Sequence, residues 1–214
     1  YAMIGCLVGS EMCRSDRLST APWLDGTPYF GSWTHPYEIS ETNISNIINS
    51  KYIWLSHGHP DHIDSKSYKY LHNAIILIPD HFGDRIFHYF DKYFECIKIK
   101  SDVWFEISKN VRIKSFADWN QDAALVVEIQ KKDCISNMND VNLLGWKPTV
   151  KKLIKRYPNR FLLRLMNWGD ADMINLYDEN DNFIKPEASK REPLGPSYDY
   201  HMNDMGCNLS LIHI

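Results

Sequence analysis

Two short apolar runs constrain the fold of this chain most strongly. They are Tyr52-Ile53-Trp54-Leu55 and Ala74-Ile75-Ile76-Leu77-Ile78, and polar segments flank both. Runs of this length and composition are typical of strands that are buried on both faces. Residues 65–73 and 81–93, which come after the first and the second run, have the pattern of helices. The order strand, helix, strand, helix predicts an α/β layer.

The second half of the sequence has a different pattern. Short segments rich in β-branched or aromatic residues are separated by turn residues, which predicts antiparallel strands over 95–99, 102–107, 110–116 and 122–130. Beyond them we expect a strand over 135–139, a helix over 147–156 and a strand over 161–166. Before the first run, isoleucines at 44, 47 and 48 predict a helix with Ser40 as its N-cap. The mixture of elements indicates a layered α/β architecture.

Length and charge limit the classes of function. The 214 residues indicate one domain, and 44% hydrophobic and 24% charged residues are ordinary for a globular protein. A net charge of -3 provides neither the basic footprint of a nucleic-acid-binding protein nor a polybasic membrane anchor. No stretch approaches the ~18 consecutive apolar residues of a membrane span. We therefore expect a small-molecule substrate, no nucleic-acid partner and no integral membrane segment, and the oligomeric state stays open.

The cysteines and the amino-terminal residues indicate the cellular compartment in which the protein is expected. The five cysteines are scattered and form no C-x-x-C pair, so we expect reduced thiols in a cytoplasmic protein. Residues 1–20 lack the basic start and apolar run of a signal peptide. The chain begins with Tyr1 instead of Met, as expected of a fragment or a processed product.

The feature that carries chemistry follows the first apolar run directly. His57, His59, Asp61 and His62 lie within six residues. In an extended or turning backbone, side chains two positions apart project to the same side. His57 and His59 are therefore placed to bind one metal ion. Asp61 and His62 come after the turn and are placed to reach a second. The alternative is a surface turn that is rich in histidine by chance, and three of nine histidines beside an aspartate make it the weaker interpretation.

The pattern H-x-H-x-D-H after an apolar strand resembles the signature of the metallo-β-lactamase superfamily, whose fold is a four-layer αββα sandwich. Pro22-Trp23-Leu24 with Gly26 is similar to a D-P-W-L segment of one branch, although Ala21 stands in place of the Asp. That branch includes the metallo-hydrolase-like domain of CMP-N-acetylneuraminate hydroxylase, L-ascorbate-6-phosphate lactonases and N-acylphosphatidylethanolamine-hydrolysing phospholipase D. The resemblance runs from Pro22 to past Gly169, and it implies one metallo-β-lactamase-like domain over 1–214.

The resemblance also implies a set of metal ligands. His57 and His59 match the first metal position, and Asp61 and His62 match the second. A further ligand, usually His, is expected some fifty to sixty residues on, where Asp118 has the best place and Asp122 is the fallback.

A bridging aspartate then matches Asp140. Imidazole and carboxylate together suit zinc, with two ions expected, and they also suit iron or manganese.

The final ligand of the family is a histidine near the carboxyl end of the domain. His201 and His213 are the only histidines after His88, and neither lies at a strand end followed by more chain. We therefore expect a chain that is truncated before this ligand.

The activity that the resemblance implies is hydrolysis of a small ester, lactone or phosphodiester by metal-activated water, with Asp61 orienting the water as well as binding metal. The alternatives are a redox or accessory domain and a degenerate, non-catalytic one. No G-x-S-x-G elbow, P-loop or G-x-G-x-x-G supports a serine hydrolase or a nucleotide-binding fold.

The remaining histidines and acidic residues have ordinary interpretations. His72, His81 and His88 fall on predicted helices. His81 and His88 are seven residues apart, and a solvated face is their expected environment, with a metal site as the weaker alternative. His35 lies in an aromatic loop, where lining a pocket is the weaker alternative. Asp170 and Asp172 are expected in an exposed turn, with a role near the substrate as the weaker alternative.

Overall fold

The first sheet is built on two strands that are buried on both faces. The computed structural model describes residues 5–6, 17–31, 33, 35, 38–138, 141–163, 176–177, 183–184, 200 and 202–210. Strands β2 (Leu18–Thr20), β3 (Tyr52–Trp54), β4 (Ile75–Pro79) and β5 (Cys96–Ile99) are parallel, and β1 (Gly5–Cys6) adds antiparallel to β2. Parallel neighbours need a crossover connection. The crossovers carry α1 (Glu41–Ile48), α2 (Ser65–Tyr68) and α3 (Arg85–Phe90).

The second sheet consists mainly of antiparallel strands joined by hairpins. In chain order these are β6 (Phe105–Ser108), β7 (Val111–Ala117), β8 (Ala123–Ile129) and β9 (Asp133–Asn137). The chain then crosses over through α4 (Lys147–Ile154) to β10 (Asn159–Leu163), which is parallel to β9 and is followed at the edge by β13 (Leu209–Ser210). A separate antiparallel pair is formed by β11 (Leu176–Tyr177) and β12 (Phe183–Ile184).

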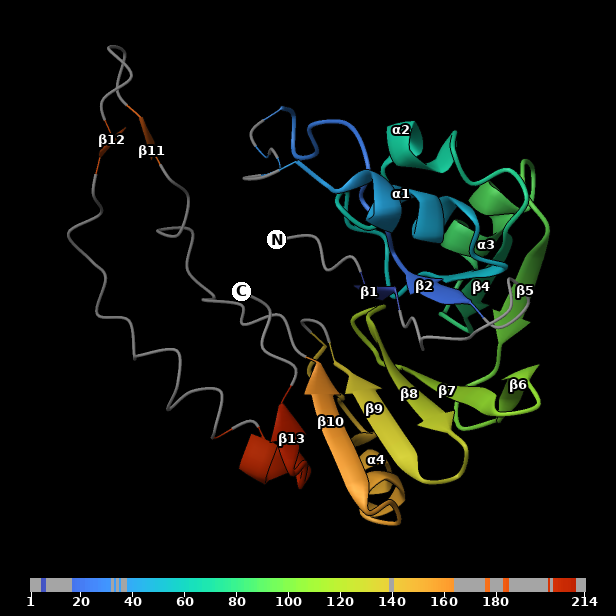
Figure 1. The fold of residues 1–214 in the computed structure, drawn as a ribbon, viewed down its shortest axis with the longest axis vertical. Coiled ribbons are helices and arrows are strands. Elements are labelled where there is room, and N and C mark those ends of the chain that lie inside the picture. The colour runs from blue at the N-terminus through green and yellow to red at the C-terminus, as the bar shows by residue number, and fades with distance from the viewer. Residues whose placement is uncertain are drawn as a thin grey trace.

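The two sheets lie face to face with helices on the outer faces (Figure 1). The alternation of side chains along each strand explains why both faces of the sheets are covered. Trp54 and Leu77 contribute to the apolar layer between the sheets, whereas Ile53 and Ile76 pack in the layer that includes residues of the helices α1 to α3. Successive residues of a strand point to opposite faces, so a strand with no polar face must be covered on both sides.

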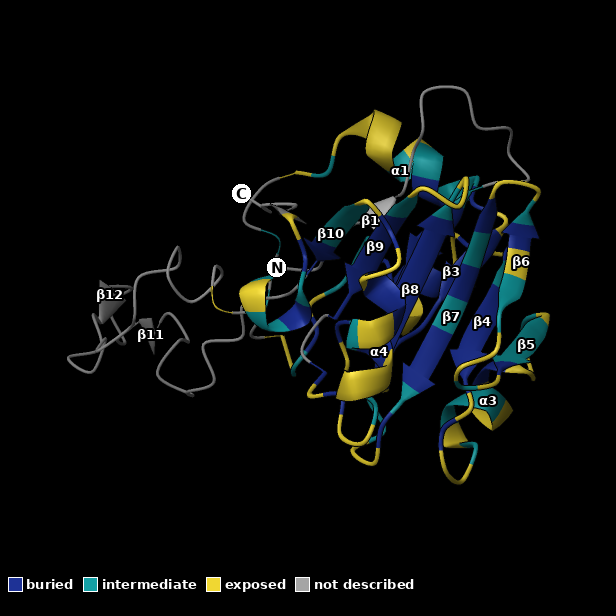
Figure 2. Cartoon of the chain, turned by 90° about the horizontal axis from the view of Figure 1, so that it is seen from below, coloured by how far each residue is buried: buried dark blue, intermediate teal, exposed yellow. Residues whose placement is uncertain are grey.

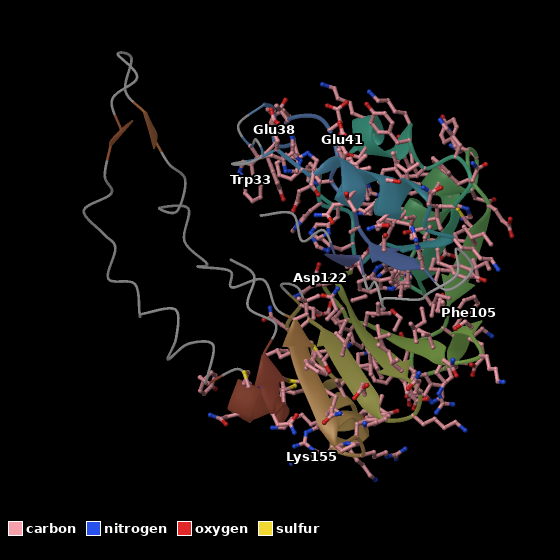
Figure 3. The ribbon with its side chains drawn as sticks, in the orientation of Figure 1. Trp33, Glu38, Glu41, Phe105, Asp122 and Lys155 are labelled. Atoms are coloured by element: carbon pink, nitrogen blue, oxygen red, sulfur yellow. The ribbon has the colours of Figure 1, made fainter. Side chains whose placement is uncertain are left out.

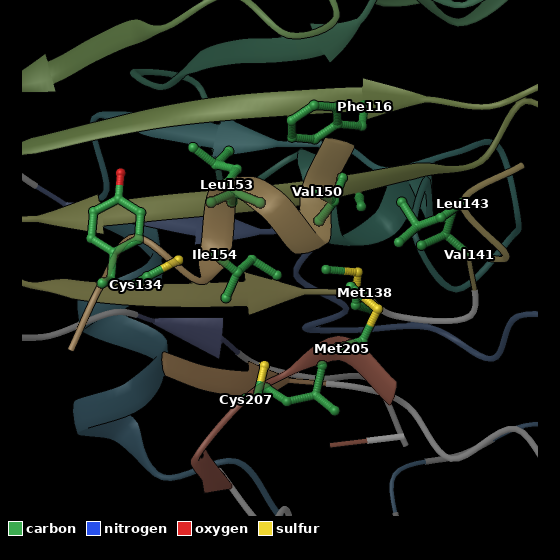
Figure 4. Packing of buried hydrophobic residues seen from close by; sticks show 14 residues of the cluster. Phe116, Cys134, Met138, Val141, Leu143, Val150, Leu153, Ile154, Met205 and Cys207 are labelled. Carbon is green, nitrogen blue, oxygen red and sulfur yellow. The ribbon is translucent and has the colours of Figure 1, made fainter. Parts of the chain in front are cut away.

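The second sheet is covered in the same way. Leu125 of β8 faces the first sheet, and Val126 faces the other way into a cluster with α4. Figure 4 shows this outer layer, in which Val150 and Ile154 of α4 lie over the strands. The central strands β4 and β8 are mostly buried, whereas the outer surface of α4 is exposed (Figure 2). The four-layer αββα arrangement expected from the sequence is therefore confirmed.

Several expected elements differ from those observed. The sequence pattern predicts an antiparallel strand over 95–99, but this prediction is wrong: β5 is parallel to β4 because α3 returns the chain to the same end of the sheet. The helices expected over 65–73 and 81–93 are shorter, and α3 begins after Asp84, whose φ of 53° is left-handed. The strand expected from 102 begins only at Phe105, after a left-handed turn residue, Asp102. The N-cap prediction is confirmed, because Ser40 Oγ accepts a hydrogen bond from Asn43 N at 3.3 Å.

One carboxylate is buried in the otherwise apolar strand β8. Glu128 accepts hydrogen bonds from Arg112 Nε at 2.5 Å and Nη2 at 2.9 Å, and from the Tyr157 hydroxyl. Burial raises the pKa of Glu128, but the hydrogen bonds from Arg112 and Tyr157 outweigh it, so that the pKa lies below its ordinary value of 4.5. The ionised form of Glu128 is therefore stabilised in the folded protein.

No helix in the described part of the chain is long and apolar enough to cross a membrane.

Replacing Glu128 by Gln should lower the free energy of unfolding by about 2 kcal/mol at pH 7, since charge-assisted hydrogen bonds are lost. The lowered pKa means that this stabilisation is complete above pH 4.5 and is lost as the pH falls through the pKa of the folded protein. Urea unfolding of both proteins at a series of pH values measures the difference. Glu95→Gln, at an exposed residue, is the control. Equal stability of wild type and Glu128→Gln at pH 7 would contradict the assignment.

Candidate metal centre

The histidine motif lies at the carboxyl end of β3, beside the carboxyl end of β4. Ligand sites of open α/β sheets form at this end of parallel strands. Leu55 N still donates to Leu77 O at 3.0 Å, and the chain then leaves the sheet. The amides of His62 and Ile63 both donate to His59 O, at 2.9 and 3.0 Å. This turn brings the second half of the motif back towards the first.

His57 and His59 face each other. Nε2 of His57 lies 2.7 Å from Nδ1 of His59, and the ring centroids are 4.3 Å apart. His57 is only 2% exposed. Burial, together with the charges of His62, His59 and His81, lowers the pKa of His57 to about 2. The ring is therefore neutral near pH 7, which is the form that binds metal ions.

Asp61 and His62 form a second facing pair. Asp61 Oδ2 lies 3.3 Å from His62 Nε2. The other carboxylate oxygen, Oδ1, accepts a hydrogen bond from the Tyr29 hydroxyl at 2.8 Å. Tyr29 in turn packs on Trp33, with ring centroids 4.6 Å apart. The aromatic loop before α1 thus holds the motif carboxylate in place.

Ser56 connects the two pairs from behind. Its Oγ lies 2.8 Å from His57 Nδ1 and 3.4 Å from His62 Nδ1. The Nε2 atom of each ring is directed away from Ser56, towards His59 in one case and Asp61 in the other. Partners of this kind fix the orientation of ligating imidazoles. The sequence interpretation did not include Ser56 or Tyr29.

The turn between β7 and β8 provides the two aspartates proposed for the next ligand. Asp118 Oδ1 accepts hydrogen bonds from the amides of Asn120 at 2.9 Å and Asp122 at 3.2 Å. Its Oδ2 is buried and has no partner among the described residues. Asp122 Oδ1 lies 3.8 Å from His57 Nδ1, and Figure 3 shows Asp122 at the end of the second sheet that adjoins the first. Asp122, the fallback, is therefore the aspartate that contacts the motif, and Asp118 holds the turn.

Other predicted residues lie outside the described ranges. They are Asp140, His201, His213, Asp170 and Asp172. Their proposed roles remain predictions.

The chemical types of the described donor atoms suit a metal ion, but their positions do not form a complete site. Neutral imidazoles and a carboxylate are suitable ligands for zinc, iron or manganese. Within the described ranges, however, no three His, Cys, Asp or Glu side chains are grouped so that they could hold a metal ion. The structure thus brings the four motif ligands together as two pairs, and it does not gather a complete coordination sphere.

His81 belongs to this region, although the sequence interpretation placed it on a solvated helix face. That prediction was wrong, because His81 comes before α3 and is 6% exposed. Its Nε2 lies 2.9 Å from Ser56 O, and burial lowers its pKa. The signal that could have located it is its position two residues after β4, the strand next to β3. His88, by contrast, is exposed on α3.

His35 stacks on Trp23, with ring centroids 4.0 Å apart. This contact indicates packing in the aromatic loop. A cavity of about 390 Å³ lies elsewhere, between α2 and α3, where Tyr68, Tyr89 and Phe90 are among its lining residues. None of the four motif ligands lines it.

No protein-family model matches the sequence, and no curated protein matches it. Among solved structures, the chain is similar to "a possible metal-dependent hydrolase" from Veillonella parvula DSM 2008 (8% identity, 71% of this chain and 79% of that chain, TM-score 0.44). It is also similar to CmlA, a diiron beta-hydroxylase from Streptomyces venezuelae (9%, 68% and 30%, 0.46), and to the metallo-beta-lactamase fold protein YhfI from Bacillus subtilis (12%, 77% and 86%, 0.38). These values support no inference about activity.

Replacing Ser56 by Ala should weaken zinc binding by roughly 10–100-fold, since both rings lose the partner that orients them. Competition with a chromophoric chelator measures the affinity. Ser115→Ala is a matched control, because Ser115 is also fully buried and its Oγ has no partner in the described part of the chain. If Ser56→Ala binds zinc as tightly as the control, Ser56 does not orient the ligands.

Proposed function

We propose that this chain is a metal-dependent hydrolase of the metallo-β-lactamase superfamily that acts on a small ester, lactone or phosphodiester. The observation that carries the proposal is the pairing of donor atoms in the loop after β3. His57 Nε2 faces His59 Nδ1, and Asp61 Oδ2 faces His62 Nε2. Two pairs at the carboxyl end of a strand in an αββα sandwich support two metal positions.

Zinc is the proposed metal, with two ions, and iron or manganese would suit the same donors. His57 and His59 would hold the first ion, and Asp61 and His62 the second. When bound, such ions lower the pKa of a coordinated water to about 7 and so provide hydroxide near neutral pH.

The chain's own residues would prepare the reaction. Asp61 is held by the Tyr29 hydroxyl on one oxygen, so its other oxygen keeps a fixed direction for binding metal and for orienting the water. Ser56 holds the rings of His57 and His62. Tyr29 and Trp33 bring aromatic surface next to Asp61, where they would limit the size of the substrate. We propose a small-molecule substrate on these grounds.

A second candidate is a non-hydrolytic or degenerate domain with a redox or accessory role. The observation in its favour is that no three described donors are grouped for a metal ion. Asp118, where the family pattern usually has His, points the same way. Metal content separates these functions, since a redox role requires iron and a degenerate domain binds no metal in stoichiometric amount.

Elemental analysis of the purified chain should find zinc, and replacing His59 by Ala should remove most of it, because a ligand of the first position is lost. Hydrolysis of bis(p-nitrophenyl) phosphate, p-nitrophenyl acetate and a simple lactone should fall in parallel. His72→Ala, at an exposed histidine, is the control and should keep both metal and activity. Full metal content in His59→Ala would refute the site, and iron in place of zinc would favour the redox alternative.

Asp140 is the proposed bridging ligand, and its replacement by Ala should abolish turnover of the same substrates while leaving the far-ultraviolet circular dichroism spectrum unchanged. The reason is that a bridging carboxylate would bind both ions. Unchanged turnover would mean that Asp140 is not the bridge.

A further inference from the structure

The cavity of about 390 Å³ between α2 and α3 lies in the helical layer that covers the outer face of the first sheet (Figure 1). Its walls come from both helices and from the residues that follow each of them. Binding sites for small molecules usually have volumes of roughly 300–1,000 Å³ and mostly apolar walls with a few polar groups. None of the four motif ligands lines the cavity, so its role is independent of the proposed function.

Aromatic rings dominate the lining of this cavity. They belong to Tyr68, Tyr89, Phe90, Tyr93 and Phe94. Neighbouring rings in this group have centroids 4.9 to 6.0 Å apart and planes inclined by 44° to 83°. None of these pairs is stacked, so the rings do not fully cover one another's faces. Because aromatic rings attract each other in offset-stacked and edge-to-face arrangements, the lining favours an aromatic ligand over an aliphatic one.

The floor of the cavity is buried and its mouth is open to solvent. Tyr68 and Phe90 are only 3% and 2% exposed, and the Tyr68 hydroxyl donates to His62 O at 3.0 Å. Tyr89 and Tyr93, in contrast, are 49% and 70% exposed. A wall that is already in place spares a ligand the cost of ordering it. A small molecule can therefore enter beside the two exposed tyrosines and pack on a preformed floor.

The polar groups of the lining favour a neutral ligand. Among the described residues that line the cavity, Lys69 is the only lysine or arginine, and there is no Asp or Glu. Lys69 Nζ already lies 2.9 Å from Asp25 Oδ2. An ionic ligand would therefore find no unpaired lysine, arginine or carboxylate in these walls. Ser65 and His72 also line the cavity, and both side chains form hydrogen bonds with polar substituents.

We propose that this cavity is a binding site for a neutral aromatic molecule of one or two rings that carries a hydroxyl or a similar hydrogen-bonding group. A cavity of about 150 Å³ holds one benzene molecule, so a volume of about 390 Å³ accommodates two fused rings. The rings of the ligand pack against the aromatic side chains, and its polar group reaches Ser65 or His72. The site is separate from the candidate metal centre.

The probe for this site is 2-naphthol, a neutral molecule with two aromatic rings and one hydroxyl. Isothermal titration calorimetry should detect one molecule bound per chain. Decahydro-2-naphthol, the saturated analogue with the same carbon skeleton, should bind about tenfold more weakly, because it lacks the interactions between aromatic rings. Tyr89→Ser and Tyr93→Ser should each weaken the binding of 2-naphthol by about two- to tenfold. Phe82→Ser, at an exposed ring outside the lining, is the matched control and should bind like the wild type.

Each contrary outcome overturns a stated part of the proposal. Equal affinity for 2-naphthol and its saturated analogue would refute an aromatic ligand, and so would the absence of binding at millimolar concentration. Unchanged affinity in both tyrosine variants would place the bound molecule elsewhere on the protein.

A measurement on the unaltered protein does not depend on how the variants fold. Intermolecular nuclear Overhauser effects from 2-naphthol should reach the ring protons of Phe90 and Phe94, which line the cavity. Effects confined to Phe82 and Trp119, which are exposed and lie outside the lining, would overturn the proposal. The proposed hydrolase function is tested by metal content, so the two proposals fail separately.

Discussion

The parallel pairing of β3 with β4 is the constraint on which the rest of the structure depends. Both strands are buried on both faces, so their backbone N–H and C=O groups must pair within the sheet. The register runs from Tyr52 opposite Ile75 to Trp54 opposite Leu77. It decides which residues leave the sheet together, and it places the start of the histidine motif beside the residues that follow β4.

The apolar pattern of the sequence was sufficient to predict where the central strands lie, but not how each strand pairs with its neighbours in the sheet. The runs at 52–55 and 74–78 predicted β3 and β4 because a strand buried on both faces is apolar at every position. The order of the four layers came from the resemblance and was confirmed by the packing. The direction of β5 was missed, since residues 95–99 look the same in either orientation. The direction is determined by the path of the chain through α3, which local composition does not encode.

In the candidate site, too, the local features could be predicted from the sequence and the long-range contacts could not. The four motif ligands lie within six residues, and a local turn is enough to pair their donor atoms. His81 was misplaced because its relation to the motif exists only across the register of two strands. The sequence ranked Asp118 above Asp122 as the further ligand, but Asp122 is the aspartate that contacts the motif, because Asp118 Oδ1 caps the turn. The contribution of Tyr29 depends on a contact across 32 positions of sequence.

The shared hydroxyl of Ser56 links the protonation of the two imidazoles. One hydroxyl has a single hydrogen to donate and oxygen electron pairs that accept. If Ser56 donates to His62 Nδ1, the neutral ring of His62 carries its proton on Nε2, the atom that faces Asp61. For both rings to present an unprotonated Nε2, each Nδ1–H must instead donate to Ser56 Oγ, and the hydroxyl hydrogen must point elsewhere. The tautomers of His57 and His62 are therefore not independent, and the rotation of one O–H bond selects between them.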